Sequence, residues 1–316
     1  MAQPNQVAEA MSGDVAAAVP AASARSWLFV PGDSERKQSR ALESGADALI
    51  LDLEDSVAPA RRQAARERVV AFLAARSAHR SAQRLWVRVN APSSGELLDD
   101  LTAIVPGAPD GVVLPKISSP EEILEAHHYL SALERREGLR AASIRVLVIA
   151  TETARAVLGI ERLAAGAPRL AGLTWGAEDL GACLGVRARL GTDGSLTPVF
   201  ELARSLCLLA AAAAGVTAVD GVHADFRDRD GLVRELARAR RDGFAGKLAI
   251  HPGQIDPINE AFTPSEREIA RARRIVAAFA EAPEVGVTSL DGQMIDRPHL
   301  KQAERLLAAA ERLARR

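Results

Sequence analysis

The regular alternation of short apolar runs with helical segments between Ser26 and Pro252 limits the possible folds more than any other feature of the sequence. Eight such runs occur, at residues 26–30, 48–55, 85–90, 111–114, 146–149, 170–175, 216–220 and 247–250. Short runs rich in valine, isoleucine and leucine that alternate with helices indicate a parallel sheet buried on both faces. Eight of them over this length predict an α/β fold, a (β/α)8 TIM barrel spanning residues 25–262.

A doubly wound open sheet is the alternative architecture. Such sheets usually carry a glycine-rich phosphate-binding loop after an early strand. Neither a G-x-G-x-x-G nor a Walker sequence occurs in this chain, so the barrel is favoured. Helix boundary signals support the alternation, since Ser34 is a plausible N-cap, Gly45 a C-terminal stop, and Ser119-Pro120 a helix start.

Both ends of the chain lie outside the predicted barrel. Residues 1–24 are rich in alanine and small polar residues and are expected to form a disordered tail. Residues 263–316 exceed what barrel closure requires and are expected to form a C-terminal helical lid or arm. We expect a helix over 264–280, a connector with hinge-like Pro and Gly content over 283–292, and a second helix over 298–315.

Composition excludes several classes of function. The formal net charge of the 316 residues is -1, which points to neither a nucleic-acid nor a membrane surface as partner. No apolar run reaches the length of a membrane span. The two cysteines, Cys183 and Cys207, are too few for a disulfide framework and favour a reducing compartment, so we expect a cytoplasmic protein.

Two carboxylates follow consecutive predicted strands. Glu152 comes just after the fifth apolar run and Asp179 just after the sixth. If these strands are parallel neighbours, both side chains lie at one rim of the sheet. Paired carboxylates without a thiolate or imidazole beside them suit a hard cation such as Mg²⁺. An ordinary alternative is that acids in a first helical turn are favoured by the helix dipole.

Other polar residues also fall at the carboxyl ends of the strands, where barrel active sites lie. Arg88 is a charged residue within an apolar strand. Because an unpaired buried cation is costly, it needs an internal carboxylate such as Asp52 or Glu54, or an anionic ligand. The further strand-end residues are Asp55, Asn90, Lys116, Asp220 and His251; the last of these is interpreted as structural.

Taken together, the motifs resemble the HpcH/HpaI aldolase and citrate lyase β-subunit superfamily, in its malyl-CoA and citramalyl-CoA lyase branch. The resemblance covers residues 25 to about 310. It rests on RSWLFVPGDSERK (25–37), GADALILDLEDSV (45–57), WVRVN (86–90), VVLPKI (112–117), ETARAV (152–157), WGAEDLGACLG (175–185), GFAGKLAIHPGQI (243–255) and FTPS (262–265).

This resemblance implies a Mg²⁺-dependent (β/α)8 barrel, usually a trimer or hexamer. Such enzymes make or break a C–C bond between a CoA thioester enolate and an α-oxo acid. The implied metal ligands are Glu152 and Asp179, and the implied substrate arginine is Arg88. Asp52 and Glu54 are assigned to the substrate site together with Arg88 and Glu152.

Two further sets of residues are carried over from the resemblance. Phe29, Arg36 and Arg40 are candidates for contact with CoA. Asp296, in GQMIDRPHLKQA, matches an aspartate that reaches a neighbouring protomer's site and acts there as the acid-base group. From the residues alone, Asp296 is also a plausible cap of the helix that follows it. Arg40 stands where relatives often have lysine.

Three functions remain open at this point. The first is a free-standing lyase acting on a malyl-CoA or citramalyl-CoA type of β-hydroxyacyl-CoA thioester. The second is a malyl-CoA thioesterase on the same scaffold, which needs the same metal and arginine. The third is a citrate lyase β-subunit that acts on an acyl-carrier-bound substrate.

Overall fold

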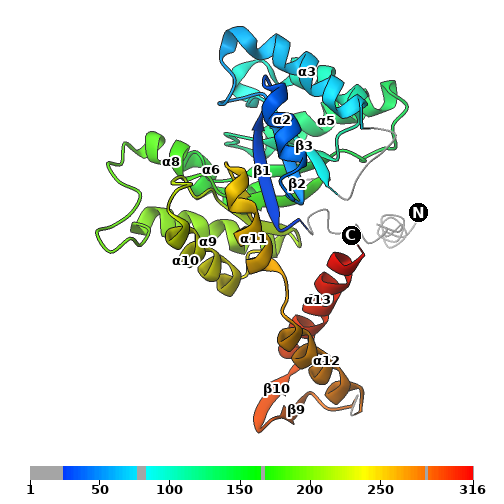
Figure 1. Cartoon of the computed structure of the whole chain (residues 1–316), viewed down its shortest axis with the longest axis vertical. Helices are drawn as coiled ribbons and strands as arrows, with labels where there is room; N and C mark the ends of the chain where they lie inside the picture. Colours follow the sequence, from blue (N-terminus) through cyan, green and yellow to red (C-terminus); the bar gives the residue numbers. More distant parts are fainter. Residues whose placement is uncertain (1–23, 77–82, 165–167, 282–283, 316) are drawn as a thin grey trace, which may run out of the picture.

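The computed structural model describes residues 24–76, 83–164, 168–281 and 284–315, and it contains a closed barrel of eight parallel strands (Figure 1). Each strand pairs with its sequence neighbours, and β1 closes the barrel on β8. The strands are β1 Ser26–Pro31, β2 Ala48–Asp52, β3 Arg84–Arg88, β4 Gly111–Leu114, β5 Arg145–Ile149, β6 Leu170–Thr174, β7 Thr217–Asp220 and β8 Gly246–Ala249. The predicted (β/α)8 barrel is therefore confirmed, and the open sheet is excluded.

Helices follow the strands and form the outer layer. They are α2 Glu35–Leu42, α3 Arg62–Ala74, α4 Leu97–Ile104, α5 Pro120–Arg136, α6 Ala154–Leu158, α7 Ile160–Ala164, α8 Ala177–Leu184, α9 Pro198–Ala213, α10 Arg229–Asp242 and α11 Ile255–Phe262. Their boundaries follow the sequence signals closely. Ser34 precedes α2, and Ser119 forms a capping box with Glu122 at the start of α5.

Large side chains fill the barrel interior. Trp27 and Trp86 meet edge to face at 5.1 Å between ring centroids. Gly111 on β4 leaves the room for this pair, since a Cβ there would lie 2.3 Å from the Trp86 ring. The apolar residues that point outward, such as Leu51 and Val112, belong to the separate and larger core beneath the helices. The interior is thus a packed core, and this packing excludes a channel through the barrel.

The amino-terminal boundary differs slightly from the predicted one. Residues 1–23 of the predicted tail lie outside the described residues. Ala24, which was assigned to that tail, is buried, and its carbonyl accepts a hydrogen bond of 3.0 Å from Trp27 Nε1. Ala24 therefore belongs to the barrel, because it packs under the interior tryptophan.

The carboxyl-terminal segment projects from the barrel as a small unit with its own core (Figure 1). Helix α12 (Glu266–Ala280), strands β9 (Val287–Leu290) and β10 (Gln293–Asp296), and helix α13 (Arg297–Ala314) form it. Its core gathers Ile275, Phe279 and Ile295. An ion pair of 2.6 Å between Arg240 and Glu268 joins it to α10.

The predicted connector over 283–292, with its hinge-like Pro and Gly content, contains regular structure that the sequence analysis did not predict. Pro283 lies outside the described residues, but 287–296 form an antiparallel hairpin. Asp291 and Gly292 both have positive φ, at 53° and 74°. This is the Asp-Gly pattern of a tight hairpin turn, so the dipeptide closes two strands.

Among the described residues, no helix has the length and apolar character to cross a bilayer.

Candidate functional site

A cavity of about 410 Å³ opens at the carboxyl ends of the strands. Its charged wall contains Asp52, Arg88, Glu152 and Asp179, which the sequence analysis had assigned to the site. Apolar residues line the same cavity and are here called its apolar wall. They include Phe29, Ile149, Val222, Leu248 and Ile250. Parallel strands end at one rim, and this brings together side chains that are far apart in the sequence.

Arg88 is held in the charged wall by ion pairs with two buried acids. Asp52 lies beside it in the register of β2 and β3 and accepts two hydrogen bonds, from Arg88 Nε at 2.6 Å and from Nη2 at 2.7 Å. Glu54 Oε2 lies 3.0 Å from Arg88 Nη1. The predicted need of Arg88 for an internal carboxylate is confirmed. Its guanidinium carbon also lies 4.8 Å from the centroid of the Phe29 ring, a favourable cation–π contact.

The electrostatics of this pair follow from its burial. Burial alone would raise the pKa of Asp52, but the hydrogen bonds and the charge of Arg88 hold it below its ordinary value. Burial would lower the pKa of Arg88, and the same partner raises it. Asp52 is therefore ionised, and both of its oxygens are engaged by Arg88. The geometry makes Asp52 a support for Arg88 more than a direct contact for a ligand.

Glu54 joins Arg88 to Lys116. The Lys116 ammonium lies 2.5 Å from Glu54 Oε1 and 2.9 Å from Asp55 Oδ1. Burial raises the pKa of Glu54, and the charges of Arg88 and Lys116 act against that rise. Glu54 is buried behind the two cations. Its position indicates that it fixes them relative to each other.

Glu152 is the most strongly perturbed acid at the rim. It is 4% exposed, and burial, with the nearby charges of Asp179 and Glu54, raises its pKa to about 8. One oxygen accepts a hydrogen bond from the backbone N–H of Lys116. Gly176 leaves room for this side chain, because a Cβ on Gly176 would lie 2.6 Å from Glu152 Cγ. A carboxylate so deeply buried is stabilised by a cation.

The pair of Glu152 and Asp179 suits a hard divalent cation. Asp179 stands in the first turn of α8, and Glu152 follows β5. Both line the same cavity, and Asp179 remains partly exposed. Two carboxylates with open space for water or ligand oxygens match the small number of protein ligands that Mg²⁺ takes. Within the described ranges, no cluster of three or more acidic, histidine or cysteine ligands occurs.

Two strand-end residues face away from the cavity. Asp220 points to the helix layer, where it meets Arg204 Nε at 3.1 Å and Lys247 Nζ at 3.0 Å. Asn90 bonds to Asp100 behind β3, with 2.9 Å between its Nδ2 and the carboxylate. Asp220 follows the inward-facing Val219, and successive side chains of a strand point to opposite faces. Asn90 lies beyond the end of β3, where this alternation no longer applies. Their roles are structural.

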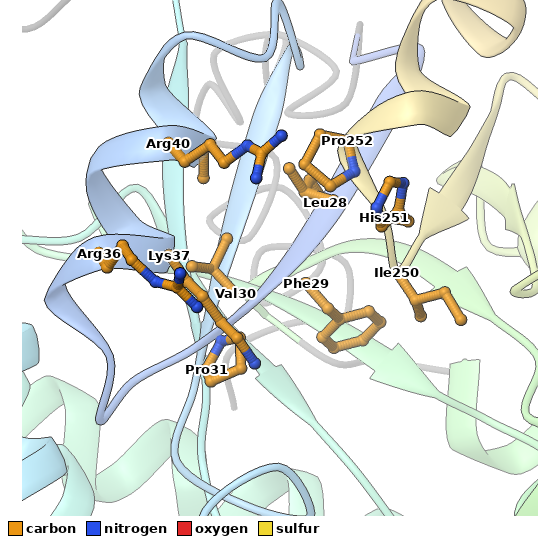
Figure 2. A pocket seen from close by; sticks show the side chains of 11 residues that line it. Leu28, Phe29, Val30, Pro31, Arg36, Lys37, Arg40, Ile250, His251 and Pro252 are labelled. Atoms are coloured by element: carbon orange, nitrogen blue, oxygen red, sulfur yellow. The ribbon is translucent and has the colours of Figure 1, made fainter. Parts of the chain in front are cut away.

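A second cavity of about 300 Å³ adjoins the first and contains all three residues predicted to contact CoA. Arg36 and Arg40 line it from α2 together with Lys37, and Phe29 faces them across the cavity (Figure 2). Phe29, Pro31 and Ile250 line both cavities. A long ligand can therefore place an anionic end at α2 and its other end beside Arg88.

His251 borders the second cavity and has a structural role as well. Its Nδ1 accepts a hydrogen bond of 3.0 Å from Gly253 N, and its ring stacks on Phe226 at 4.8 Å between centroids. These contacts fix the turn after β8. They agree with the structural interpretation made from the sequence.

Asp296 is the N-cap residue of α13. Its Oδ1 lies 2.5 Å from His299 Nδ1. In the part of the chain that the structure describes, Asp296 lines neither of the two cavities of its own barrel. The helix-cap position expected from the sequence is observed.

Apart from Phe29, the residues of the apolar wall and Gly176 are not among the site residues predicted from the sequence. Ile149 and Leu248 occupy inward positions of β5 and β8, so the period-two alternation contained the signal. Val222 and Ile250 lie beyond strand ends, where no periodicity reports the direction of a side chain. Gly176 was quoted only as part of a motif. Its spatial contact with Glu152 cannot be seen in the sequence.

Comparisons with known proteins agree with this geometry. The chain is 37% identical over 284 residues to the citrate lyase subunit beta-like protein of Mycobacterium tuberculosis, which covers 90% of this chain and 94% of the relative. It is 38% identical over 295 residues to a (3S)-malyl-CoA thioesterase of Cereibacter sphaeroides, covering 92% of this chain and 95% of that protein.

A solved structure is similar in fold as well. It is the CitE protein of Mycobacterium tuberculosis in complex with magnesium, acetoacetate and coenzyme A, with a TM-score of 0.73 and 36% identity over 92% of this chain and 99% of that one. The family of HpcH/HpaI aldolases and citrate lyases matches residues 25–252, which include the whole barrel up to the end of β8. The chain therefore belongs to the HpcH/HpaI aldolase/citrate lyase family.

Proposed function

We propose that this protein is a Mg²⁺-dependent lyase that cleaves or forms the C–C bond of a β-hydroxyacyl-CoA thioester of the malyl-CoA or citramalyl-CoA type. One observation carries the proposal. A cavity with two carboxylates and a fixed guanidinium continues into a second cavity bordered by three cations. The first suits a small oxo acid on a metal, and the second suits the phosphates of CoA.

Glu152 and Asp179 would hold the metal ion. The buried Glu152 needs a cation, and the oxygen ligands are of the type that Mg²⁺ prefers. When bound, Mg²⁺ supplies a Lewis acid that polarises the oxygen of the oxo acid or its hydroxyl precursor. The magnesium found in the related Mycobacterium tuberculosis structure supports this choice of metal.

Arg88 would stabilise the negative charge that develops on the thioester oxygen as the enolate forms. Asp52 fixes the Nε side of the guanidinium and Glu54 contacts Nη1. Preorganised donors of this kind need no rearrangement during the reaction. Asp52 and Glu54 thus contribute to the substrate site through Arg88, while Glu152 contributes through the metal.

The CoA part would lie in the second cavity. Arg36, Lys37 and Arg40 are exposed on α2 and face the cavity, and within the described chain none of them is held in an ion pair. They are therefore available to phosphate oxygens. Phe29 stands at the junction with the first cavity and would contact the chain that leads to the thioester.

Asp296 would supply the proton to, or remove it from, the methyl carbon of the acyl-CoA in a neighbouring protomer. Its position on a projecting unit, outside the cavities of its own barrel, supports a contribution in trans. The working unit would then be a homo-oligomer, a trimer or a dimer of trimers. A cytoplasmic location is part of the proposal, because the two cysteines favour a reducing compartment.

Two relatives motivate alternatives. A (3S)-malyl-CoA thioesterase is 38% identical, and hydrolysis requires only that water reach the thioester held by the same groups. The citrate lyase subunit beta of Escherichia coli is 36% identical, which motivates the alternative of a citrate lyase β-subunit that acts on an acyl-carrier-bound substrate. The cations of the second cavity favour free CoA over a carrier protein.

Incubation of the purified protein with Mg²⁺ and a panel of CoA thioesters, followed by mass spectrometry, distinguishes these functions. A lyase yields a shorter acyl-CoA and an α-oxo acid. A thioesterase yields free CoA and the intact hydroxy acid. Turnover that requires an acyl-carrier protein in place of CoA would contradict the proposal.

A further inference from the structure

Lys116 contacts both carboxylates that are proposed to hold the metal. Its backbone N–H donates a hydrogen bond to Glu152, and its Nζ lies 3.6 Å from Asp179 Oδ1. It follows β4 by two residues, while Glu152 and Asp179 follow β5 and β6. The proposed reaction assigns no step to Lys116, and its side chain is absent from the described lining of either cavity.

The backbone of Lys116 has a conformation that side chains rarely adopt. Its φ is +54°, in the left-handed region that costs free energy for every residue except glycine. Such conformations persist where surrounding contacts fix them, and they cluster at functional sites. Here the unusual conformation directs the N–H of Lys116 to a carboxylate that is 4% exposed.

The ammonium group of Lys116 lies within a ring of acids. It is 2.5 Å from Glu54 and 2.9 Å from Asp55, in addition to its approach to Asp179. It is thus a resident cation beside the place where a divalent cation would bind. The Lys116 ammonium and a divalent cation held by Asp179 would repel each other, and partial burial would strengthen this repulsion.

We propose that Lys116 sets the metal affinity of this site from two sides: its backbone N–H positions Glu152 for the metal, and its ammonium opposes the metal at Asp179. Lys116 is accordingly a positioning residue and an electrostatic counterweight. The inference rests on the Mg²⁺ site proposed above. It predicts that substitutions at one position change Mg²⁺ affinity in opposite directions, depending on whether they remove the charge or disturb the backbone.

The test measures Mg²⁺ binding to the metal-free full-length protein by isothermal titration calorimetry, with thermal denaturation of each variant alongside. Lys116→Met removes the charge and keeps an unbranched side chain, so Mg²⁺ should bind about tenfold more tightly. Lys116→Arg keeps the charge and should stay near the wild-type affinity. Lys116→Val also lacks the charge, but a β-branched residue disfavours positive φ.

The comparison of the two uncharged variants isolates the backbone. In Lys116→Val the N–H should leave Glu152, and Mg²⁺ should bind roughly 10- to 100-fold more weakly than in Lys116→Met, as is usual for a lost partner of a metal ligand. If Lys116→Val does not fold, Lys116→Gly and Lys116→Ala provide the same contrast, because glycine adopts positive φ freely. The glycine variant should then bind Mg²⁺ more tightly than the alanine variant.

Several results would overturn the inference. Equal Mg²⁺ affinity in the Met and Val variants removes the backbone role, and weaker binding in Lys116→Met than in wild type removes the opposing role. Changes in melting temperature alone would assign Lys116 a purely structural part. A wild type that binds no Mg²⁺ overturns the metal site and this inference together, whereas binding that is lost in Glu152→Gln but unchanged in all Lys116 variants overturns this inference alone.

Discussion

Replacing Gly176 by alanine should damage the metal site without unfolding the barrel. Gly176 has φ −115° and ψ 117°, a region that alanine adopts without strain. The added Cβ would lie 2.6 Å from Glu152 Cγ and 3.1 Å from Ile149 Cγ2. Ordinary carbon contacts begin near 3.5 Å, so Glu152 must retreat by about 1 Å.

A retreat of that size exceeds what a Mg²⁺ ligand tolerates, because the distance from the ligand oxygen to Mg²⁺ is held at about 2.1 Å. We expect Mg²⁺ affinity to fall roughly 10- to 100-fold, and kcat/KM on a cleavable CoA thioester to fall about 10²-fold. Overpacking costs about 1–3 kcal/mol, and the lower entropy of the unfolded alanine chain offsets about 0.4–1 kcal/mol of it. The melting temperature should therefore drop only modestly.

Calorimetric titration with Mg²⁺ and steady-state kinetics measure these effects. Gly286→Ala is the matched control, because its Cβ would meet no atom within 4 Å and its φ is not positive. The control should keep wild-type metal affinity and activity. If folded Gly176→Ala binds Mg²⁺ within about twofold of wild type, Glu152 is not a metal ligand in the observed position, and the steric reasoning fails.

Three further predictions follow from the site. Arg88→Lys should stay folded, since an ammonium still meets Asp52, but it should lose most of kcat/KM because a point charge cannot replace the planar fork; near-normal kinetics would refute the role of Arg88. Because the pKa of Glu152 is raised to about 8, Mg²⁺ affinity should fall about tenfold per pH unit below that value, as calorimetric titrations at several pH values would show. The metal-free protein should lose stability as pH rises from about 4.5 to 8, because only the folded state keeps the proton on Glu152 over that range. Thermal denaturation checks this second statement, and a flat pH profile in either experiment would contradict it. Asp296→Ala should abolish C–C bond chemistry but retain Mg²⁺ binding, and mixing this variant with Arg88→Ala should restore part of the activity through hybrid oligomers. No recovery after verified subunit exchange, or a fully active monomer, would exclude the shared site. If Asp296→Ala keeps its catalysis and loses only about 0.5–2 kcal/mol of stability, Asp296 is a helix cap.

The sequence alone determined the barrel. Strand and helix boundaries follow from local signals, such as the apolar run that became β5 and the capping box at Ser119. Once the strands are parallel, their carboxyl ends share one rim, so Glu152, Asp179 and Arg88 had to gather there. The need of Arg88 for an internal acid also followed from the sequence, because a buried cation requires one.

Only the tertiary structure decided how these groups contact one another. Asp52 and Asp220 both end apolar strands, yet one faces the cavity and the other the helices, because a shift of one residue along a strand reverses the face. The hairpin after α12 has a local signal in its Asp291-Gly292 turn, but its two short strands, which pair only with each other, carry weak local signals of their own. The positive φ of Lys116 and the close approach of Glu152 to Gly176, where an added Cβ would lie 2.6 Å from Glu152 Cγ, arise from packing between separate strands. A local sequence pattern carries no information about such packing.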